Sequence, residues 1–402
     1  MAVVNDPAAQ PRVVPLALLA VPTLALALSI TTLSALVPLL LEKLTASATL
    51  VGMIVAGEGF LALLLPLWIG RWSDRTRTRW GARLPYVFAG TPLCVAALAA
   101  LPFARSLGSI ALAVLVFYVG YFTYYTAYRA LYPDLVPHER MARSQGVQTL
   151  FRELGLALAL TACPLLFVVW APLPFLLCAA ALGAVSAVFA LRVRRFEPRQ
   201  HAPGPPPTLR SLLAGDPSFR RILLANALWE FALAGLKTFV VLYVVVGTGR
   251  AVSVASLLMG VVAVVAVIAA PIAGRLGDRH GVPRVMRVAL AVYAAGLLVP
   301  AFTDSLAILL PIMPLIGVGG AVAMALPYAL VAATLPERSH GAGAGLYEFS
   351  RGVGTLLGPL VTGAAIDAGK PLFRASHGYG AMWVVSALAV IVSLPLLPRA
   401  RR

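Results

Sequence analysis

Charged residues are scarce in this sequence, and acidic residues are especially few. Asp, Glu, Lys and Arg together make up 12% of the 402 residues, and only 15 residues are acidic. Soluble domains contain roughly 25% charged residues. Because 60% of this chain is hydrophobic, it has too little polar surface to cover its apolar residues. We therefore exclude a water-soluble globule.

Cysteine and histidine are too few and too scattered to build the sites in which they usually occur. The three cysteines lie within apolar runs, where small buried residues are expected: Cys94, Cys163 and Cys178. The five histidines lie in predicted loops or at the ends of apolar runs: His138, His201, His280, His340 and His377. Neither set has metal-ligand spacing, and no catalytic constellation is recognisable. We expect no metal site, no cofactor and no enzymatic activity.

The apolar residues form long continuous runs, which is the dominant feature of the chain. A membrane-spanning helix needs about 20 such residues, and the runs do not alternate as the strands of a membrane barrel would. Twelve spans are predicted, at 14–41, 48–70, 85–104, 107–133, 143–170, 172–192, 219–246, 251–274, 285–303, 305–335, 341–367 and 377–397. The first is too long for the core of a signal peptide. The prediction is an all-α membrane protein with 12 transmembrane helices.

The connections between the spans divide the chain into two halves. The longest connection, 193–218, is rich in proline and arginine and is predicted to be a cytoplasmic linker. It separates an N-terminal six-helix bundle (1–192) from a C-terminal six-helix bundle (219–402). Lys and Arg gather in the segments that share a side with the N-terminus, which predicts that both termini are cytoplasmic. This bias explains the net charge of +17 without a nucleic-acid partner, and we expect a bacterial inner or plasma membrane protein.

Two short motifs occur once in each half. Gly70-x-x-x-Asp74-Arg75 is repeated as Gly274-x-x-x-Asp278-Arg279. The second repeat is shorter, with Arg152-Glu153-Leu154-Gly155 aligning with Arg351-Gly352-Val353-Gly354. These repeats indicate two pseudo-symmetric bundles, an arrangement typical of transporters whose substrate site lies between the halves.

The repeated glycine–aspartate–arginine motif resembles the signature of the loops between spans 2 and 3 and spans 8 and 9 in the major facilitator superfamily. Its longer form, 73–86, is similar to the glycoside–pentoside–hexuronide symporters and the sucrose-type proton symporters, as are 128–131 and 133–135. The resemblance implies the major facilitator fold and a latch between the halves on the cytoplasmic side. The gating residues it suggests are Asp74, Arg75, Asp278, Arg279 and Arg129. The remaining loop arginines, Arg77, Arg79 and Arg83, are interpreted as determinants of topology.

Ionisable residues within the predicted spans are the next signal, because charge at membrane depth is costly and usually functional. Four acids and four bases balance each other, which allows pairing: Glu58, Glu153, Glu230 and Glu348, with Arg129, Arg152, Lys237 and Arg351. Such pairs could line a water-filled cavity or simply join helices. A carboxyl group in an apolar setting is readily protonated, so Glu58 and Glu230 are the candidate proton-coupling residues. The sodium-coupled symporters of the resembling group carry two acids in span 2, whereas this span has one, which favours protons over sodium.

The predicted substrate site combines these charges with aromatic residues. Span 4 places Tyr118, Tyr121, Tyr125, Tyr128 and Tyr132 at spacings of three and four, on one helix face. Such a stripe suits a polyhydroxy ligand, or else packs between helices; Tyr121 and Tyr125 are deepest. Asn226 shares a helix face with Glu230 and Lys237. The substrate-binding candidates are Tyr121, Tyr125, Asn226, Lys237, Arg152, Glu348 and Arg351.

Together these features favour a secondary active transporter that moves a small polar solute, with a sugar as the preferred class, by proton-coupled symport with alternating access. The alternative is a proton-coupled efflux antiporter for drugs or other hydrophobic or cationic compounds. The span 4 and span 5 motifs typical of drug antiporters are absent from the sequence. A receptor without transport activity, or a lipid scramblase, is a third hypothesis. The expected partners are the solute and the bilayer, and the expected oligomeric state is a monomer.

Overall fold

The structure is a computed structural model that describes residues 15–136, 138–193, 217–332 and 340–398. These residues fold into helices and connecting turns, and no strand occurs among them. The predicted linker, 193–218, falls almost entirely outside the described residues.

The long helices follow the predicted spans in order. The first six are α1 (Leu16–Glu42), α2 (Ala48–Arg75), α3 (Leu84–Ala100), α4 (Leu107–Leu135), α5 (His138–Val169) and α6 (Leu173–Val193). The others are α8 (Pro217–Leu242), α9 (Val252–His280), α10 (Val282–Phe302), α11 (Leu306–Ala325), α12 (Pro327–Ala332), α13 (His340–Gly369) and α14 (Gly380–Ser393). A π-helical turn, Tyr243–Gly247, continues α8.

Within the described ranges, 10 helices are long and apolar enough to cross a membrane. The 30-residue α13 and the shorter apolar helix Gly380–Leu396 occupy the eleventh and twelfth predicted positions. The prediction of an all-helical, membrane-spanning fold is therefore confirmed.

Four of the predicted spans had wrong boundaries. The tenth predicted span, 305–335, is two helices, because α11 ends at Ala325 and α12 begins at Pro327. A proline inside a helix removes one backbone hydrogen bond and clashes with the preceding turn. The second, fifth and eighth spans were predicted too short, since α5 begins before its apolar run and α2 and α9 continue through the charged motif to Arg75 and His280. Charged side chains are compatible with a helix that extends beyond the apolar layer.

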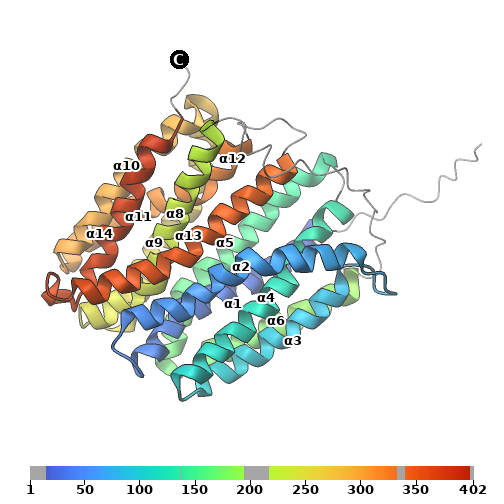
Figure 1. Ribbon diagram of the computed structural model, residues 1–402, viewed down its shortest axis with the longest axis horizontal. Coiled ribbons are helices and arrows are strands. Elements are labelled where there is room, and N and C mark those ends of the chain that lie inside the picture. Colours follow the sequence, from blue (N-terminus) through green and yellow to red (C-terminus); the bar gives the residue numbers. More distant parts are fainter. Residues whose placement is uncertain (1–14, 137, 194–216, 333–339, 399–402) are drawn as a thin grey trace, which may run out of the picture.

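The helices form two groups (Figure 1). In the first, α1 packs against α5 and α6, and α3 lies between α4 and α6. In the second, α8 packs against α13 and α14, while α11 packs against α9 and α10. The groups meet along α2 and α13, along α5 and α9, and along α1 and α8. The α2–α13 and α5–α9 contacts are equivalent under a six-helix repeat, which agrees with the predicted pseudo-symmetry.

The two ends of the bundle differ. We call the end that contains the α2–α3 connection (76–83) and Gly281, between α9 and α10, the signature end. The other end, which contains the α1–α2 connection (43–47) and the end of α13, is called the far end. In Figure 1, α2 and α13 approach each other at the far end and diverge toward the signature end.

Close helix packing in the first group depends on glycine. A Cβ atom added at Gly90 on α3 would lie 2.5 Å from the carbonyl oxygen of Gly120 on α4. We predict that Gly90→Ala lowers the stability of the protein by about 1–3 kcal/mol, because overpacking forces the two backbones apart. Thermal unfolding in detergent measures the effect. Gly183→Ala is the matched control, since its added Cβ would be 3.6 Å from Val95; equal losses for both variants would contradict the prediction.

Candidate functional site

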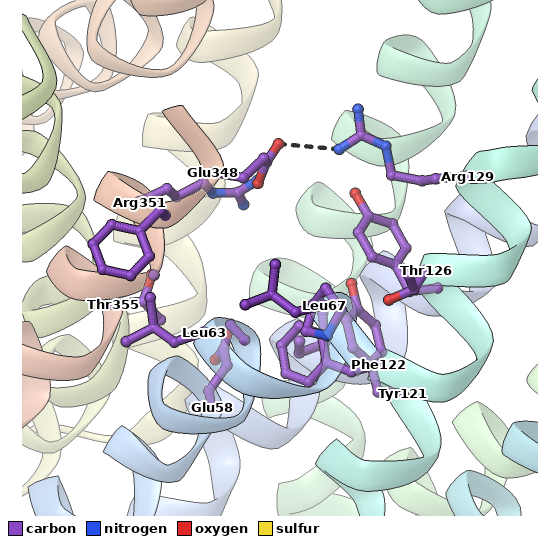
Figure 2. Close-up of a pocket in the computed structure, with 16 residues that line it drawn as sticks. Glu58, Leu63, Leu67, Tyr121, Phe122, Thr126, Arg129, Glu348, Arg351 and Thr355 are labelled. Atoms are coloured by element: carbon purple, nitrogen blue, oxygen red, sulfur yellow. Dashed lines mark hydrogen bonds and ion pairs between the residues drawn. The ribbon is translucent and has the colours of Figure 1, made fainter. Parts of the chain in front are cut away.

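A cavity of about 300 Å³ lies between α1, α2 and α4 of the first group and α13 of the second. Figure 2 shows its lining side chains directed into the space between the two groups. The lining is mixed, and its polar members are Glu58, Tyr121, Tyr125, Thr126, Arg129, Glu348, Arg351 and Thr355. The apolar members include Ile30, Leu63, Leu67, Phe122 and Phe349. Both groups of helices therefore contribute to one site.

The exposure of the lining residues shows the direction in which the cavity opens. Tyr121 is 8% exposed and the Glu58 side chain 13%, and both lie near the middle of their helices. Leu67, nearer the signature end of α2, is 59% exposed, and Phe349, nearer the signature end of α13, is 54% exposed. Since α2 and α13 diverge toward the signature end (Figure 1) and pack backbone against backbone nearer the far end, the cavity is open toward the signature end and closed toward the far end.

Two stacked tyrosines form one wall of the cavity. The rings of Tyr121 and Tyr125 lie 5.3 Å apart with an interplanar angle of 18°. The guanidinium group of Arg129, one turn further along α4, lies 5.7 Å from the Tyr125 ring centre. A flat aromatic surface beside a charged, hydrogen-bonding group suits a ligand with both an apolar face and hydroxyl groups.

The predicted five-tyrosine stripe does not act as one face. Tyr121 and Tyr125 line the cavity, as the sequence predicted. Tyr128 and Tyr132 instead donate hydrogen bonds to the carbonyl oxygen of Leu19 on α1, and Tyr118 is fully buried. Because α1 packs along part of the stripe, these three tyrosines have the packing role that was the alternative interpretation.

Glu58 pairs with a base from the other group of helices. Its Oε2 atom lies 3.4 Å from Nζ of Lys237 on α8 and accepts a hydrogen bond of 3.3 Å from Ser34 on α1. Lys237 was predicted to share a helix face with Glu230, but its partner in the structure is Glu58.

A second chain of charges crosses the cavity nearer its mouth. Arg129 on α4 donates to Oε1 of Glu348 on α13 at 3.0 Å, the contact drawn as a dashed line in Figure 2. Arg351 lies 3.6 Å from the other oxygen of Glu348 and 3.3 Å from Glu230 on α8. The prediction that intramembrane acids and bases pair is confirmed. The i, i+3 spacing of Glu348 and Arg351 on α13 explains their contact. The contacts of Glu348 with Arg129 and of Arg351 with Glu230 depend on the packing of α13 against α4 and α8.

Three of the predicted substrate residues lie outside the cavity lining: Lys237, Arg152 and Asn226. Arg152 pairs with its neighbour Glu153 at 2.8 Å. Asn226 is 1% exposed, and its amide donates to Ser350 at 2.8 Å. Asn226 therefore holds α8 against α13 in this conformation, and its placement gives no direct contact with a ligand.

The signature motif is paired within its own group. Arg83, at the start of α3, lies 2.6 Å from Asp74 and 3.1 Å from Asp134 at the end of α4. It also donates to Ser73 at 2.6 Å. The interpretation of Arg83 as a topology determinant alone missed these contacts. Asp134 could have indicated an acidic partner for Arg83, because it belongs to the stretch 133–135, which is similar to the same symporter group.

The other predicted gating residues are exposed. Arg75, Asp278 and Arg279 lie at the helix ends of the signature end, and none has an ion pair with another residue that the structure describes. The signature end therefore has no motif-based ion pair between the described parts of the two groups, which is consistent with the open cavity there.

Nearly the whole chain, from residue 19 onward, matches a family of membrane transport proteins. The family profile described as Major Facilitator Superfamily matches residues 19–249 and 236–402. Among solved structures, a bacterial homologue of the human lysosomal transporter Spinster, inward-facing and occupied, has 17% identity over 95% of each chain and a TM-score of 0.76. The nucleoside transporter NupG has 16% identity over 94% of this chain and 96% of its own, with a TM-score of 0.73. At these identities the structures show a shared fold.

The Glu58–Lys237 pair generates a stability prediction. Lys237→Met should lower the free energy of unfolding by about 3 kcal/mol, because it leaves a largely buried carboxylate without its cation. Adding Glu58→Gln should recover part of the loss, since no charge then remains unpaired. Thermal unfolding of both single variants and the double variant forms the cycle, with the exposed Lys43→Met as control. Additive losses would show that the pair makes no contribution.

Proposed function

Because the chain belongs to the major facilitator superfamily and is thus an integral membrane protein, we propose that it is a secondary active transporter for a small polar solute. The favoured solute class is a sugar, and the favoured mode is symport with protons. The observation that carries the proposal is the cavity whose walls come from both halves of the chain. A site between two bundles can be exposed to each side in turn when the bundles rock.

The cavity lining supports a polyhydroxy solute. Its volume of about 300 Å³ is at the lower end of small-molecule sites. The stacked rings of Tyr121 and Tyr125 offer a surface for one face of a sugar ring. Arg129, Glu348 and Arg351 offer both donors and acceptors to hydroxyl groups. These charges are already paired with one another, so a neutral solute can bind without leaving a charge uncompensated.

The proposed coupling residue is Glu58. It lines the cavity, whereas Glu230 is absent from the lining residues. Protonation of Glu58 removes its charge and so weakens its attraction to Lys237, which belongs to the other half. Proton binding thereby changes the strength of a contact that the two halves must break and remake during rocking. Sodium coupling is the less favoured alternative, and no other cofactor is part of the proposal.

The proposed orientation places the signature end in the cytoplasm, as the distribution of Lys and Arg favours. The structure then corresponds to a state open to the cytoplasm. In the opposite state Asp74, Arg75, Asp278 and Arg279 would latch the closed signature end, in addition to the Arg129–Glu348 pair that already crosses the cavity in the present state. The protein is proposed to act as a monomer.

The more specific kinship with sucrose-type and glycoside symporters also stays a proposal. One contact supports it, because Arg83, within 73–86, pairs with Asp134, within 133–135, and both stretches carry the resemblance. The competing function is proton-driven efflux of hydrophobic or cationic compounds. In symport the solute moves in the same direction as the protons, whereas in efflux by antiport it moves in the opposite direction, so the sign of proton-driven solute movement separates the two functions.

The coupling proposal is tested by Glu58→Gln in proteoliposomes. A panel of neutral sugars is first screened for uptake driven by an imposed proton gradient. With a transported sugar, the variant should lose concentrative uptake, because its residue 58 cannot exchange a proton, but should keep counterflow exchange. Glu42→Gln, an exposed acid at the end of α1, is the matched control. Normal accumulation by Glu58→Gln would rule out this residue as the coupling group.

The aromatic wall is tested by substitution of Tyr125. Tyr125→Leu should raise the KM for a transported sugar by about tenfold, because the loss of one stacking ring removes roughly 1 kcal/mol or more. Tyr125→Phe should stay closer to the unsubstituted protein, since the ring remains. Tyr86→Leu, which lies outside the cavity lining, is the control. An unchanged KM for Tyr125→Leu would remove the aromatic wall from the substrate site.

A further inference from the structure

A carboxylate outside the cavity joins the two halves at the far end. Asp367, near the end of α13, accepts four hydrogen bonds from the first residues of α2. Its Oδ2 atom accepts from the hydroxyl of Ser47 at 3.0 Å and from the hydroxyl and amide of Thr49 at 2.7 and 2.8 Å. Its Oδ1 atom accepts from the amide of Ala48 at 3.2 Å. We call this set of contacts the far-end clasp.

The clasp has a clear physical basis. The first amides of a helix have no partner within the helix, and they carry the positive end of its dipole. A capping side chain normally comes from the residue just before the helix, and Ser47 fills that role by accepting from the amide of Leu50. Asp367 adds a second cap from the other half of the molecule, on the amides of Ala48 and Thr49. Lys370 completes the arrangement, since its ammonium group lies 2.8 Å from Asp367 and 3.2 Å from the carbonyl oxygen of Ala46.

Behind the clasp, α2 and α13 touch through their backbones. A Cβ atom added at Gly52 would lie 2.2 Å from the carbonyl oxygen of Pro359, and one added at Gly363 would lie 2.4 Å from that of Ala48. Small residues permit such an approach between membrane helices. This contact closes the cavity toward the far end, and the clasp lies at its outer limit.

We propose that Asp367 is a positioning residue for transport, which holds the far end closed while the cavity is open at the signature end. The contacts on α2 come from the opposite half, so all of them must break when the far end opens. Water can then hydrate the freed amides, which makes the clasp reversible. The inference rests on the proposed alternating access, and its test needs no knowledge of the solute.

The test measures distances between spin labels at both ends of the ligand-free protein by double electron–electron resonance. One pair, Arg105→Cys with Phe302→Cys, reports on the far end at exposed positions away from the clasp. The other, Arg79→Cys with His280→Cys, reports on the signature end. Each pair places one label in each half. The three native cysteines are buried and should label poorly.

Asp367→Ala should increase the ratio of far-end-open to far-end-closed molecules by about tenfold or more, as expected when hydrogen bonds to a charged group are lost. The far-end distance should lengthen while the signature-end distance shortens. Unchanged distances would overturn the proposal. A change confined to the first turn of α2 would leave both pairs unchanged and would overturn it equally.

A second variant keeps the test decisive if Asp367→Ala folds poorly. Gly52→Ala adds a methyl group against Pro359 and should shift both distances in the same directions. Gly57→Ala is the matched control on the same helix, since nothing lies within 4 Å of its added Cβ. If the variants shift the distances but no solute is transported, the clasp stands and the transport proposal fails. If transport is observed and the distances do not respond, the clasp is wrong.

Discussion

An ionised side chain within a bilayer is stable only with a partner of opposite charge or with access to water, and this constraint organises the protein. Among the described residues, three sets of polar side-chain contacts join the two halves: Arg129 with Glu348, Lys237 with Glu58, and Asp367 with the start of α2. They follow one another from the signature end to the far end. Each half therefore supplies charges that the other half must satisfy.

This arrangement connects folding to mechanism. Two apolar bundles slide over each other at little cost in lipid, whereas paired charges favour a few discrete arrangements. The far end is closed by the clasp and by backbone contact between α2 and α13, while the signature end is open, with Arg83 and Asp74 paired inside one half. In the proposed cycle, closing one end requires the contacts at the other to release. Glu58 lies between the two ends, and in the proposed cycle its protonation changes the relative stability of the conformations open at one end or the other.

The apolar runs predicted the helices because the bilayer sets their length. The prediction failed where Pro327 divided a span, and where α2, α5 and α9 extend beyond the apolar run. Charge balance predicted pairing, but not the partners. Glu58 and Lys237 are 179 residues apart, and only the packing of the halves brings them together. Tyr121 and Tyr125 were correctly placed in the cavity. Tyr128, Asn226 and Asp367 contact residues on other helices. The spacing of residues along one helix does not show which other helices pack against it, so these contacts were not predicted.

The central claim is that protonation within the cavity shifts the two ends in opposite directions. The most direct measurement uses the two spin-label pairs, one at each end, in a chain with no other substitution. Double electron–electron resonance in lipid follows both distances as the pH is lowered from neutral to acidic. The account predicts that the signature-end distance shortens as the far-end distance lengthens, and that Glu58→Gln makes both insensitive to pH. Distances that stay constant, or that change in the same direction at both ends, would contradict it.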